Sequence, residues 1–402
     1  MIASLQHLKF VRRADVYKAG VLAGQLERTK DGNVLFSYAA KYLEEGHWPV
    51  ATSLPLSSQG FSTSTGALPP FFTGLLPEGH RLTVLRKATK TSLDDELTLL
   101  LAIGADVPGD VQVIPTGESP VEPPSLADTS SPKDLDFSSL ANAVDLHGLP
   151  GVQSKASASM LTTPLALRGQ RYLLKLDPRD NPHLVENEEL HLLGAHGLKI
   201  PVAKGSVITD RRGVKGLLVE RFDRIKDRRG EWVRLPLEDG TQVLGLPPAS
   251  KYSVDSEDVA VGLSRLCRAP MVAIRNIYLQ FLFAWLTGNG DLHAKNLSIL
   301  GQGGGGFAMA PVYDVPCTLL YGDDTLALPL AGKLKNLKAR HWAEFAESLG
   351  LRPRAAAAAN ATALRAANSI DLRHLPFTGS PIRGAERELR FRRAELDQGA
   401  TR

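Results

Sequence analysis

Hydrophobic and polar positions follow two different patterns in the first 110 residues. Residues 16–27 and 33–43 hold short alternating apolar and polar runs, which predict strands on either side of a turn at 30–33. Residues 92–106 are predicted to be helical, and Ser92, followed by Glu96 and apolar residues, is predicted to cap the start of that helix.

A second pattern begins after residues 115–135. That stretch contains five prolines and few large apolar groups, which indicates a surface linker and the best domain boundary in the chain. Gly197 is predicted to end a helix that starts at residue 183. The predicted elements on both sides of the linker are strands at 110–115, 171–176, 205–210 and 216–223, helices at 183–198 and 271–287, a β-hairpin from 296–300 to 307–314, and mostly helix from about 338.

Composition limits the class of protein but does not indicate which reaction it catalyses. The 402 residues suit two or three packed subdomains, and 47 basic against 43 acidic residues leave a charge of only +4, too small to argue for DNA binding. Cys267 and Cys317 form no C-x-x-C pair and are predicted to be buried thiols. The first ten residues lack a signal-peptide core and the most apolar run, 278–286, is half a bilayer long, so we expect a cytoplasmic protein without a membrane span.

The strongest chemical signal is the run GNGDLHAKNLSIL followed by FAMAPVYDVP. Asp291 and Asn296 are five residues apart at a helix exit, and Asp314 follows the return strand of the hairpin. Protein kinases use this order, because phosphoryl transfer needs a carboxylate to deprotonate the acceptor and hard oxygen ligands to hold Mg²⁺. A lone D-x-x-x-x-N would be an ordinary capped loop, but the hairpin and second aspartate favour a kinase-like site.

Two residues of the same loop leave alternatives open. His293 is either a ligand or base, or a residue that supports the loop by hydrogen bonding, which we favour. Lys295 either touches the transferred phosphate or is a solvated lysine.

Upstream, Lys175 lies inside an apolar strand and must place its charge on a partner or in water. In kinase-like folds such a lysine binds phosphates and pairs with a carboxylate of the next helix, here Glu188 or Glu189.

Two further segments fit a nucleotide site weakly. The Gly-rich turn GLPGVQSKAS at 148–157 exposes N–H groups suited to phosphates, although it is not a Walker A loop. The strand GLLVERFDR at 216–224 suits a hinge that reads adenine through backbone groups, and it also fits an ordinary core strand followed by a charged turn.

Together these residues resemble the HipA family of toxin kinases. The motifs LPGVQSKAS, LLKLDP, ENEELHLLGAHGL, LLVERFDR, NGDLHAKNLSIL and PVYDVP occur in the order of that family, and FFTGLLPEGHR is similar to its N-terminal signature. The resemblance spans residues 10–340. It implies an α+β, bilobal protein-kinase-like fold with a β-rich N-terminal subdomain and a mostly helical C-terminal lobe. The implied domains are 1–114 (N-terminal subdomain), 115–135 (linker), 136–250 (kinase N-lobe with phosphate loop, lysine strand and hinge) and 251–402 (helical C-lobe).

The resemblance also implies roles for single positions. Asp291 is similar to the catalytic base, Asn296 and Asp314 to the magnesium ligands, and Lys175 to the lysine that binds the phosphates of ATP. The remaining positions that match nucleotide contacts are Pro150, Gly151, Val152, Gln153, Ser154, Lys155, Glu220, Arg221, Phe222, His293 and Tyr313. Gly148 stands where the family often has an autophosphorylated serine, so that switch is not expected unless a nearby serine replaces it.

Family members imply partners as well. They are serine/threonine protein kinases of toxin–antitoxin pairs, with a translation protein such as an aminoacyl-tRNA synthetase as substrate. A small HipB-like helix-turn-helix antitoxin binds the toxin, so contact with DNA is indirect. The alternatives are a small-molecule phosphotransferase of the antibiotic type, which would lack the FFTGLLPEG unit, and a catalytically silent binding platform for the antitoxin.

Overall fold

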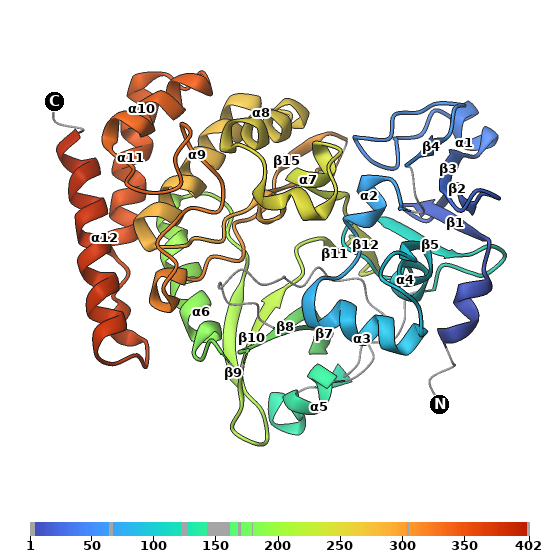
Figure 1. Cartoon of the computed structure of the whole chain (residues 1–402), viewed down its shortest axis with the longest axis horizontal. Coiled ribbons are helices and arrows are strands. Elements are labelled where there is room, and N and C mark those ends of the chain that lie inside the picture. The colour runs from blue at the N-terminus through green and yellow to red at the C-terminus, as the bar shows by residue number, and fades with distance from the viewer. Residues whose placement is uncertain are drawn as a thin grey trace.

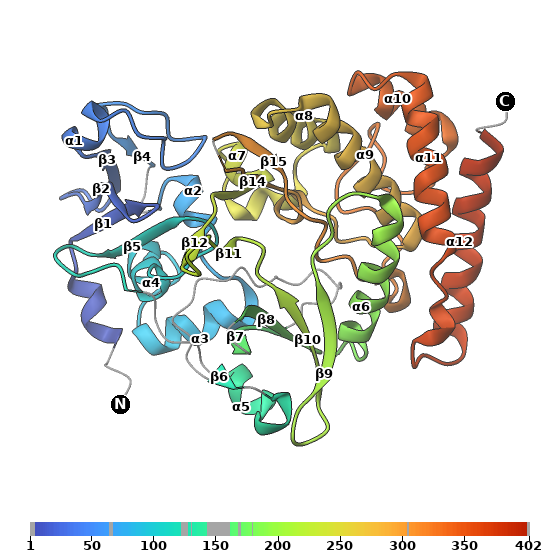
Figure 2. The same cartoon turned by 180° about the vertical axis from the view of Figure 1, so that it is seen from behind.

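A computed structural model describes residues 5–63, 67–121, 128–129, 131–142, 161–167, 170–178, 180–303 and 305–399. The molecule is an α+β protein, as expected. An N-terminal sheet, a central sheet and a helical C-terminal part surround a common centre (Figures 1 and 2). Among the described residues, no helix is long and apolar enough to cross a bilayer.

The N-terminal sheet is antiparallel and has the order β4-β3-β2-β1-β5. In β3, alternate residues are buried because successive side chains of a strand point to opposite faces. The strands are β1 (Arg13–Lys18), β2 (Val21–Arg28), β3 (Val34–Tyr38), β4 (Phe61–Ser62) and β5 (Val111–Pro115). The helices of this unit are α1 (Ala40–Glu44), α2 (Pro70–Thr73), α3 (Gly79–Thr89) and α4 (Glu96–Ile103), with a 3₁₀ turn at Leu5–Phe10.

Two predictions for this unit were wrong in detail. Residues 16–27 form no single strand, because Ala19 and Gly20 both adopt positive φ, 49° and 80°, and make a tight turn between β1 and β2. Residues 33–43 hold β3 and then the start of α1. The cap of α4 is Asp95, whose side chain accepts the Thr98 N–H, whereas the Ser92 hydroxyl accepts from Asp94 outside the helix.

The central sheet has the order β6-β7-β8-β10-β9, and α6 packs against β9 and β10. Gly197 does not end α6 in a left-handed turn. The chain continues as a 3₁₀ turn to Leu198, and Lys199 is the residue that adopts a positive φ. Gly197 is instead required for packing, because a Cβ at this position would press on Ala366. The elements are β6 (Asp128–Thr129), η2 (Pro132–Asp134), α5 (Phe137–Asn142), β7 (Leu161–Leu167), β8 (Gln170–Leu176), α6 (Leu184–Ala195), η3 (His196–Leu198), β9 (Gly205–Thr209) and β10 (Lys215–Glu220).

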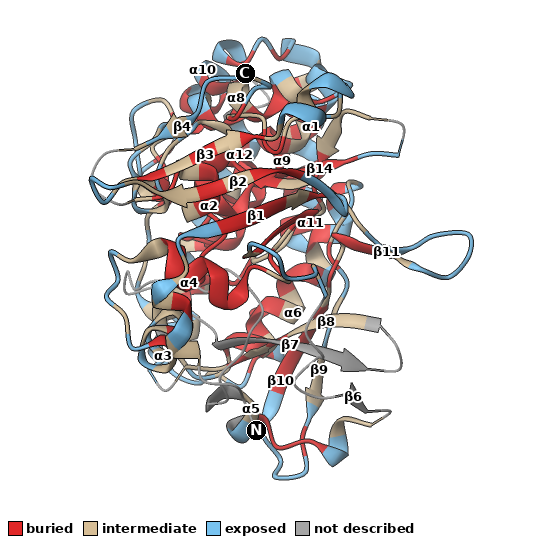
Figure 3. Ribbon diagram, turned by 90° about the vertical axis from the view of Figure 1, so that its right-hand side faces the viewer, coloured by how far each residue is buried: buried red, intermediate tan, exposed pale blue. Residues whose placement is uncertain are grey.

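The C-terminal part is built around α9 (Pro270–Thr287), which was predicted at 271–287. From Ile277 to Thr287 every residue of α9 is buried, because other elements cover the helix on all sides (Figure 3). Cys267 and Cys317 are buried free thiols, as predicted. The other helices are α7 (Gly240–Val243), α8 (Ser256–Leu266), α10 (Ala339–Ser348), α11 (Pro353–Asn368) and α12 (Ser380–Gly399), with 3₁₀ turns η4 (Pro248–Tyr252), η5 (Ala294–Asn296), η6 (Thr318–Tyr321) and η7 (Leu372–His374).

Two small sheets complete this part. The predicted hairpin is present as β14 (Ser298–Gly301) and β15 (Phe307–Met309), and β13 (Leu237–Asp239) adds a third strand to it. A second hairpin, β11 (Arg224–Lys226) and β12 (Trp232–Arg234), ends in an exposed loop that projects from the molecule in Figure 3.

Buried charges join the N-terminal unit to the rest of the chain. Asp106, which follows α4, accepts from Arg221 at 2.8 Å and from Arg224 at 2.6 Å, and all three side chains are buried. Asp223 pairs with both arginines from the other side and accepts the Gly109 N–H at 3.0 Å. Opposite charges that satisfy one another in this way make the contact costly to break. The N-terminal unit is therefore held against the segment that follows β10.

Candidate active site

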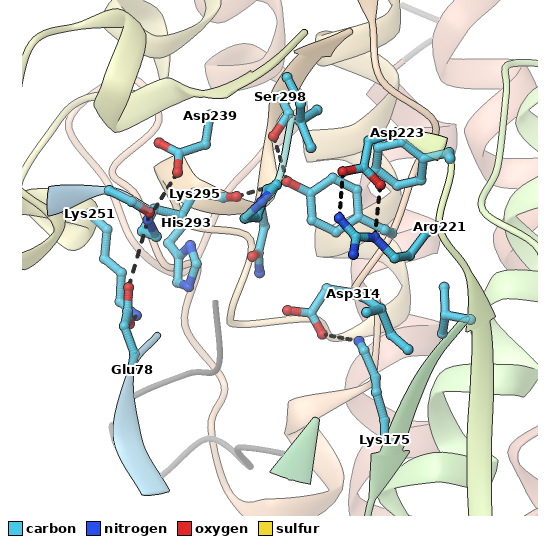
Figure 4. Close-up of a pocket in the computed structure, with 18 of the residues that line it drawn as sticks. Glu78, Lys175, Arg221, Asp223, Asp239, Lys251, His293, Lys295, Ser298 and Asp314 are labelled. Atoms are coloured by element: carbon cyan, nitrogen blue, oxygen red, sulfur yellow. Dashed lines mark hydrogen bonds and ion pairs between the residues drawn. The ribbon is translucent and has the colours of Figure 1, made fainter. Parts of the chain in front are cut away.

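A pocket lies where the N-terminal unit, the central sheet and the helical part meet (Figure 4). All of the predicted site residues within the described range line it. They are Lys175, Glu220, Arg221, Phe222, Asp291, His293, Asn296, Tyr313 and Asp314. The predicted phosphate loop, Pro150 to Lys155, lies outside the described residues, as does Gly148.

The end of α9 shapes the loop that carries Asp291. The helix stops at Gly288, whose φ of 77° suits glycine, and the chain turns sharply into the loop. The side chain of Asn289 accepts the Asp291 N–H at 2.8 Å, and the Thr318 hydroxyl accepts the Gly290 N–H at 2.7 Å. These bonds fix the backbone on both sides of Gly290, so the loop presents Asp291 to the pocket in a defined position.

Asp291 is buried, with 6% of the residue exposed, and its Oδ1 accepts a 2.8 Å hydrogen bond from the hydroxyl of Tyr252. Burial raises the pKa of Asp291 to about 7, and the nearby charge of Asp314 acts in the same direction. The hydrogen bond from Tyr252 opposes this shift. A carboxyl with a pKa near neutrality can both take and release a proton at physiological pH.

Asn296 and Asp314 are the two residues predicted to hold magnesium, and both line the pocket. The Nδ2 of Asn296 donates to the Asp291 carbonyl at 2.8 Å, which leaves the amide oxygen for another partner. Asp314 has a φ of 55°, a strained conformation for a residue with a side chain, and such strain is common at functional sites. No cluster of three or more His, Cys, Asp or Glu residues with metal-binding geometry occurs in the described part of the chain.

Lys175 in β8 forms a buried charge network. Its Nζ donates to both carboxylate oxygens of Glu188 in α6, at 2.8 and 2.9 Å, and to Asp314 at 3.0 Å. Burial disfavours the charged lysine, but the carboxylates of Asp314 and Glu188 outweigh it and raise the pKa of Lys175. Of the two partners proposed from sequence, Glu188 makes the contact, and Glu189 instead accepts the Val207 N–H.

The segment predicted as a hinge borders the apolar side of the pocket. The rings of Phe222 and Tyr313 lie 5.6 Å apart there. The N–H of Glu220 donates to the Lys204 carbonyl and that of Arg221 to the Arg171 carbonyl, so these two donors are not free for a ligand. Arg221 itself is held by Asp106 and Asp223. The interpretation of 216–224 as a hinge thus depends on the other backbone groups of the segment.

The surroundings of His293 differ from the favoured alternative, and those of Lys295 exclude one of its two alternatives. His293 is 1% exposed, and neither ring nitrogen has a hydrogen-bond partner among the described residues, so its side chain does not support the loop as expected. Burial lowers its pKa to about 3, which keeps the imidazole neutral. Lys295 is not solvated. It is buried and donates to Asp239 at 3.0 Å and to the Gly74 carbonyl at 3.1 Å.

Comparison with known proteins identifies the family. Residues 14–114 match the model of the HipA N-terminal domain, and residues 147–370 match that of the HipA-like C-terminal domain. The chain belongs to the HipA family. Among its relatives, an inferred kinase of Sinorhizobium fredii, Y4mE, is 31% identical over 85% of this chain and 86% of its own length. The serine/threonine-protein kinase toxin HipA of Shewanella oneidensis is 26% identical over 84% of this chain and 83% of its own.

The fold of this HipA-family protein also matches a solved structure. The match is the Shewanella oneidensis MR-1 HipA, determined with HipB and operator DNA, with a TM-score of 0.74, 21% identity and 96% coverage of both chains. At this identity the likeness establishes the fold, which confirms the expected kinase-like α+β architecture. The domain boundaries proposed from sequence remain predictions.

Several residues in or beside the pocket were not predicted as site residues. Among them, Glu78, Asp239 and Lys251 line the pocket, and Tyr252 contacts Asp291. Glu78 lies within the quoted FFTGLLPEGHR signature, but nothing in that run indicates that its carboxylate reaches residues 170 positions away. Lys251 and Tyr252 follow a Pro-Pro-Ala-Ser stretch that resembles an ordinary turn. Only the fold brings them beside Asp291.

Proposed function

We propose that this chain is a serine/threonine protein kinase that uses ATP and Mg²⁺. The observation that carries the proposal is the convergence of Lys175, Asp291, Asn296 and Asp314 on one pocket, although they are spread over 140 residues of sequence. A buried lysine for the phosphates, a carboxylate with a pKa near neutrality and two oxygen ligands are the parts that phosphoryl transfer requires. The family membership and the kinase relatives support the same reaction.

The donors present suit magnesium. Mg²⁺ is commonly held by one or two protein oxygens together with substrate phosphates and water, so a full cage of carboxylates is not needed. Asn296 and Asp314 would hold the ion, which neutralises phosphate charge when bound. In the structure one oxygen of Asp314 already accepts from Lys175. We infer that Lys175 and Asp314 share the phosphate-binding end of the pocket.

In the proposed reaction Asp291 acts as the base. Its carboxylate takes the proton of a serine or threonine hydroxyl, whose oxygen forms a bond to the γ-phosphorus. The bond from that phosphorus to the β–γ bridging oxygen breaks, and ADP leaves with the electron pair. The hydrogen bond from Tyr252 occupies Oδ1 of Asp291, so Oδ2 is the oxygen that faces the acceptor.

We further infer that the kinase is the toxin of a toxin–antitoxin pair in the cytoplasm. A HipB-like helix-turn-helix antitoxin would bind it and connect it to operator DNA, as HipB does in the Shewanella assembly. A translation protein such as an aminoacyl-tRNA synthetase is the proposed substrate. A short helix-turn-helix reading frame beside this one would support the pairing, and co-expression of its product should relieve growth arrest.

Labelling with ATP tests the proposal. The wild-type protein with γ-labelled ATP and Mg²⁺ should transfer phosphate to a protein in a cell extract and should arrest growth on expression. Asp291→Asn should reduce transfer by orders of magnitude, since a general base is lost. The matched control is Asp31→Asn in the exposed β2–β3 turn, which should label like wild type. Equal labelling by Asp291→Asn would refute the role of Asp291, and transfer to sugars alone would favour a small-molecule kinase.

A further inference from the structure

Lys251 is a buried cation whose place in the pocket needs an explanation. It lies in η4, only 4% of the residue is exposed, and its Nζ contacts Glu78 Oε2 at 2.5 Å. Glu78 comes from the N-terminal unit, 173 residues earlier in the chain. In Figure 4 the two residues lie on the opposite side of the pocket from Arg221 and Asp223. A charge pair between two units, facing a shared pocket, can serve the reaction as well as the fold.

The position of Lys251 is next to the reacting carboxylate. Its Nζ lies 5.3 Å from the centre of the Tyr252 ring, and the Tyr252 hydroxyl bonds to Asp291. The ring of His293 packs edge-on against Tyr252 at 5.0 Å. Consistent with this placement, the charge of Lys251 lowers the pKa of Asp291 and of Asp314. The ammonium group therefore acts on both aspartates.

Of the three lysines that line the pocket among the described residues, Lys251 makes the fewest hydrogen bonds. His293 is neutral, and Lys295 donates to Asp239 and the Gly74 carbonyl and lies 3.8 Å from Glu78 Oε1. Lys175 lies across the pocket with Glu188 and Asp314. Within the described part of the chain Lys251 donates one hydrogen bond, to Glu78, which leaves two N–H groups for a ligand. A transferred phosphoryl group carries negative charge on three oxygens and is stabilised by fixed cations.

We propose that Lys251 is a catalytic residue that donates hydrogen bonds to the γ-phosphoryl group, and that Glu78 is a positioning residue that holds it there. This inference rests on the proposed kinase function and deepens it. The N–H groups of Lys251 stay hydrogen-bonded to the phosphoryl oxygens while the bond from phosphorus to the acceptor oxygen forms and the bond to ADP breaks. Lys251 neither gains nor loses a proton. The N-terminal unit thereby becomes part of the active centre through one carboxylate.

Nucleotide binding tests the contact without turnover. In an Asp291→Asn background with Mg²⁺, Lys251→Met should weaken ATP binding about ten- to hundredfold, the usual effect of losing a charged hydrogen bond. ADP binding should stay within about twofold, since ADP has no γ-phosphate. Lys175→Met is the matched comparison and should weaken both nucleotides. An equal loss of ATP and ADP affinity in Lys251→Met, or no loss of either, would overturn the proposal.

A second set of variants separates catalysis from folding. Lys251→Met leaves Glu78 without its lysine partner and could therefore destabilise the fold. The double variant Glu78→Gln/Lys251→Met removes both charges and should fold. Its preference for ATP over ADP should be no greater than that of Lys251→Met. Glu78→Gln alone should lower kcat more than it raises KM for ATP, and Glu78→Asp should recover part of the loss. The exposed pair Lys41–Glu45 provides the control, and Lys41→Met should behave as wild type.

The outcomes distinguish the two proposals. If the wild-type protein transfers no phosphate from ATP to any protein, the proposed function fails. If the wild type is active and Lys251→Met is equally active with the same ATP to ADP preference, only the role of Lys251 fails. If Glu78→Gln lowers stability but leaves kcat unchanged, Glu78 joins the two units and does not position the lysine.

Discussion

The hydroxyl of Tyr252 donates a 2.8 Å hydrogen bond to Oδ1 of Asp291, across 39 residues of sequence. The bond fixes the carboxyl plane and occupies one of its two oxygens. It also favours the ionised form of a carboxyl whose burial favours the protonated form. Tyr252 therefore influences both the orientation and the basicity of the proposed catalytic base, and the following predictions depend on this environment.

The first prediction concerns the pH dependence of the wild-type enzyme. Asp291 has a pKa raised to about 7 and must be ionised to accept a proton. We expect kcat/KM for the protein acceptor to fall about tenfold per pH unit well below 7 and to level off above it, because this ratio reports groups of the free enzyme. A flat profile from pH 5.5 to 8 would contradict the elevated pKa.

The second prediction concerns Tyr252→Phe. The substitution removes a hydrogen bond that lowers the pKa of Asp291, so the acidic limb of the kcat/KM profile should move to higher pH. Above that limb the variant should retain activity within about tenfold of wild type, since the carboxylate itself remains. A lower plateau with an unmoved limb would mean that Tyr252 only packs against the site.

The third prediction concerns the loop before Asp291. A Cβ at Gly290 would come within 2.5 Å of the Asp323 carboxylate and 2.6 Å of the Thr325 carbonyl, closer than atoms can approach. Gly290→Ala should displace the loop and reduce kcat about a hundredfold or more, because misplacement by about 1 Å is that costly. Gly303→Ala, where a Cβ meets nothing within 4 Å, is the control and should be fully active.

The fourth prediction concerns the buried charges between the units. Asp106→Ala would leave the buried side chains of Arg221 and Arg224 with one carboxylate fewer, at a cost of about 3–5 kcal/mol in the free energy of unfolding. Urea denaturation measures the loss. Glu27→Ala breaks the exposed pair with Arg13 and should change stability by less than about 1 kcal/mol. Equal effects would show that the cluster is not stabilising.

Much of the local structure followed from the sequence. The helix at 271–287, the hairpin from 296–300 to 307–314 and the strands at 205–210 and 216–223 were each predicted near their observed positions, because each is set by nearby periodicity and turn residues. The errors arose where tertiary contacts dominate. Gly197 was predicted as a helix end, but its lack of a side chain instead allows close packing on Ala366. Helix α3 was missed, since only three of residues 79–89, Leu82, Val84 and Leu85, are large and apolar.

The sequence by itself determined which residues could do the chemistry. The order Asp291, Asn296, Asp314 and the lysine strand are local motifs, and they were sufficient to indicate a kinase-like site and the HipA family. Only the tertiary structure decided how those residues are paired. Lys175 meets Asp314 across 139 positions and Lys251 meets Glu78 across 173, and no periodicity or turn signal encodes such contacts. Each unit folds around its own hydrophobic core, and where the units meet, burial compels each charge to find a partner.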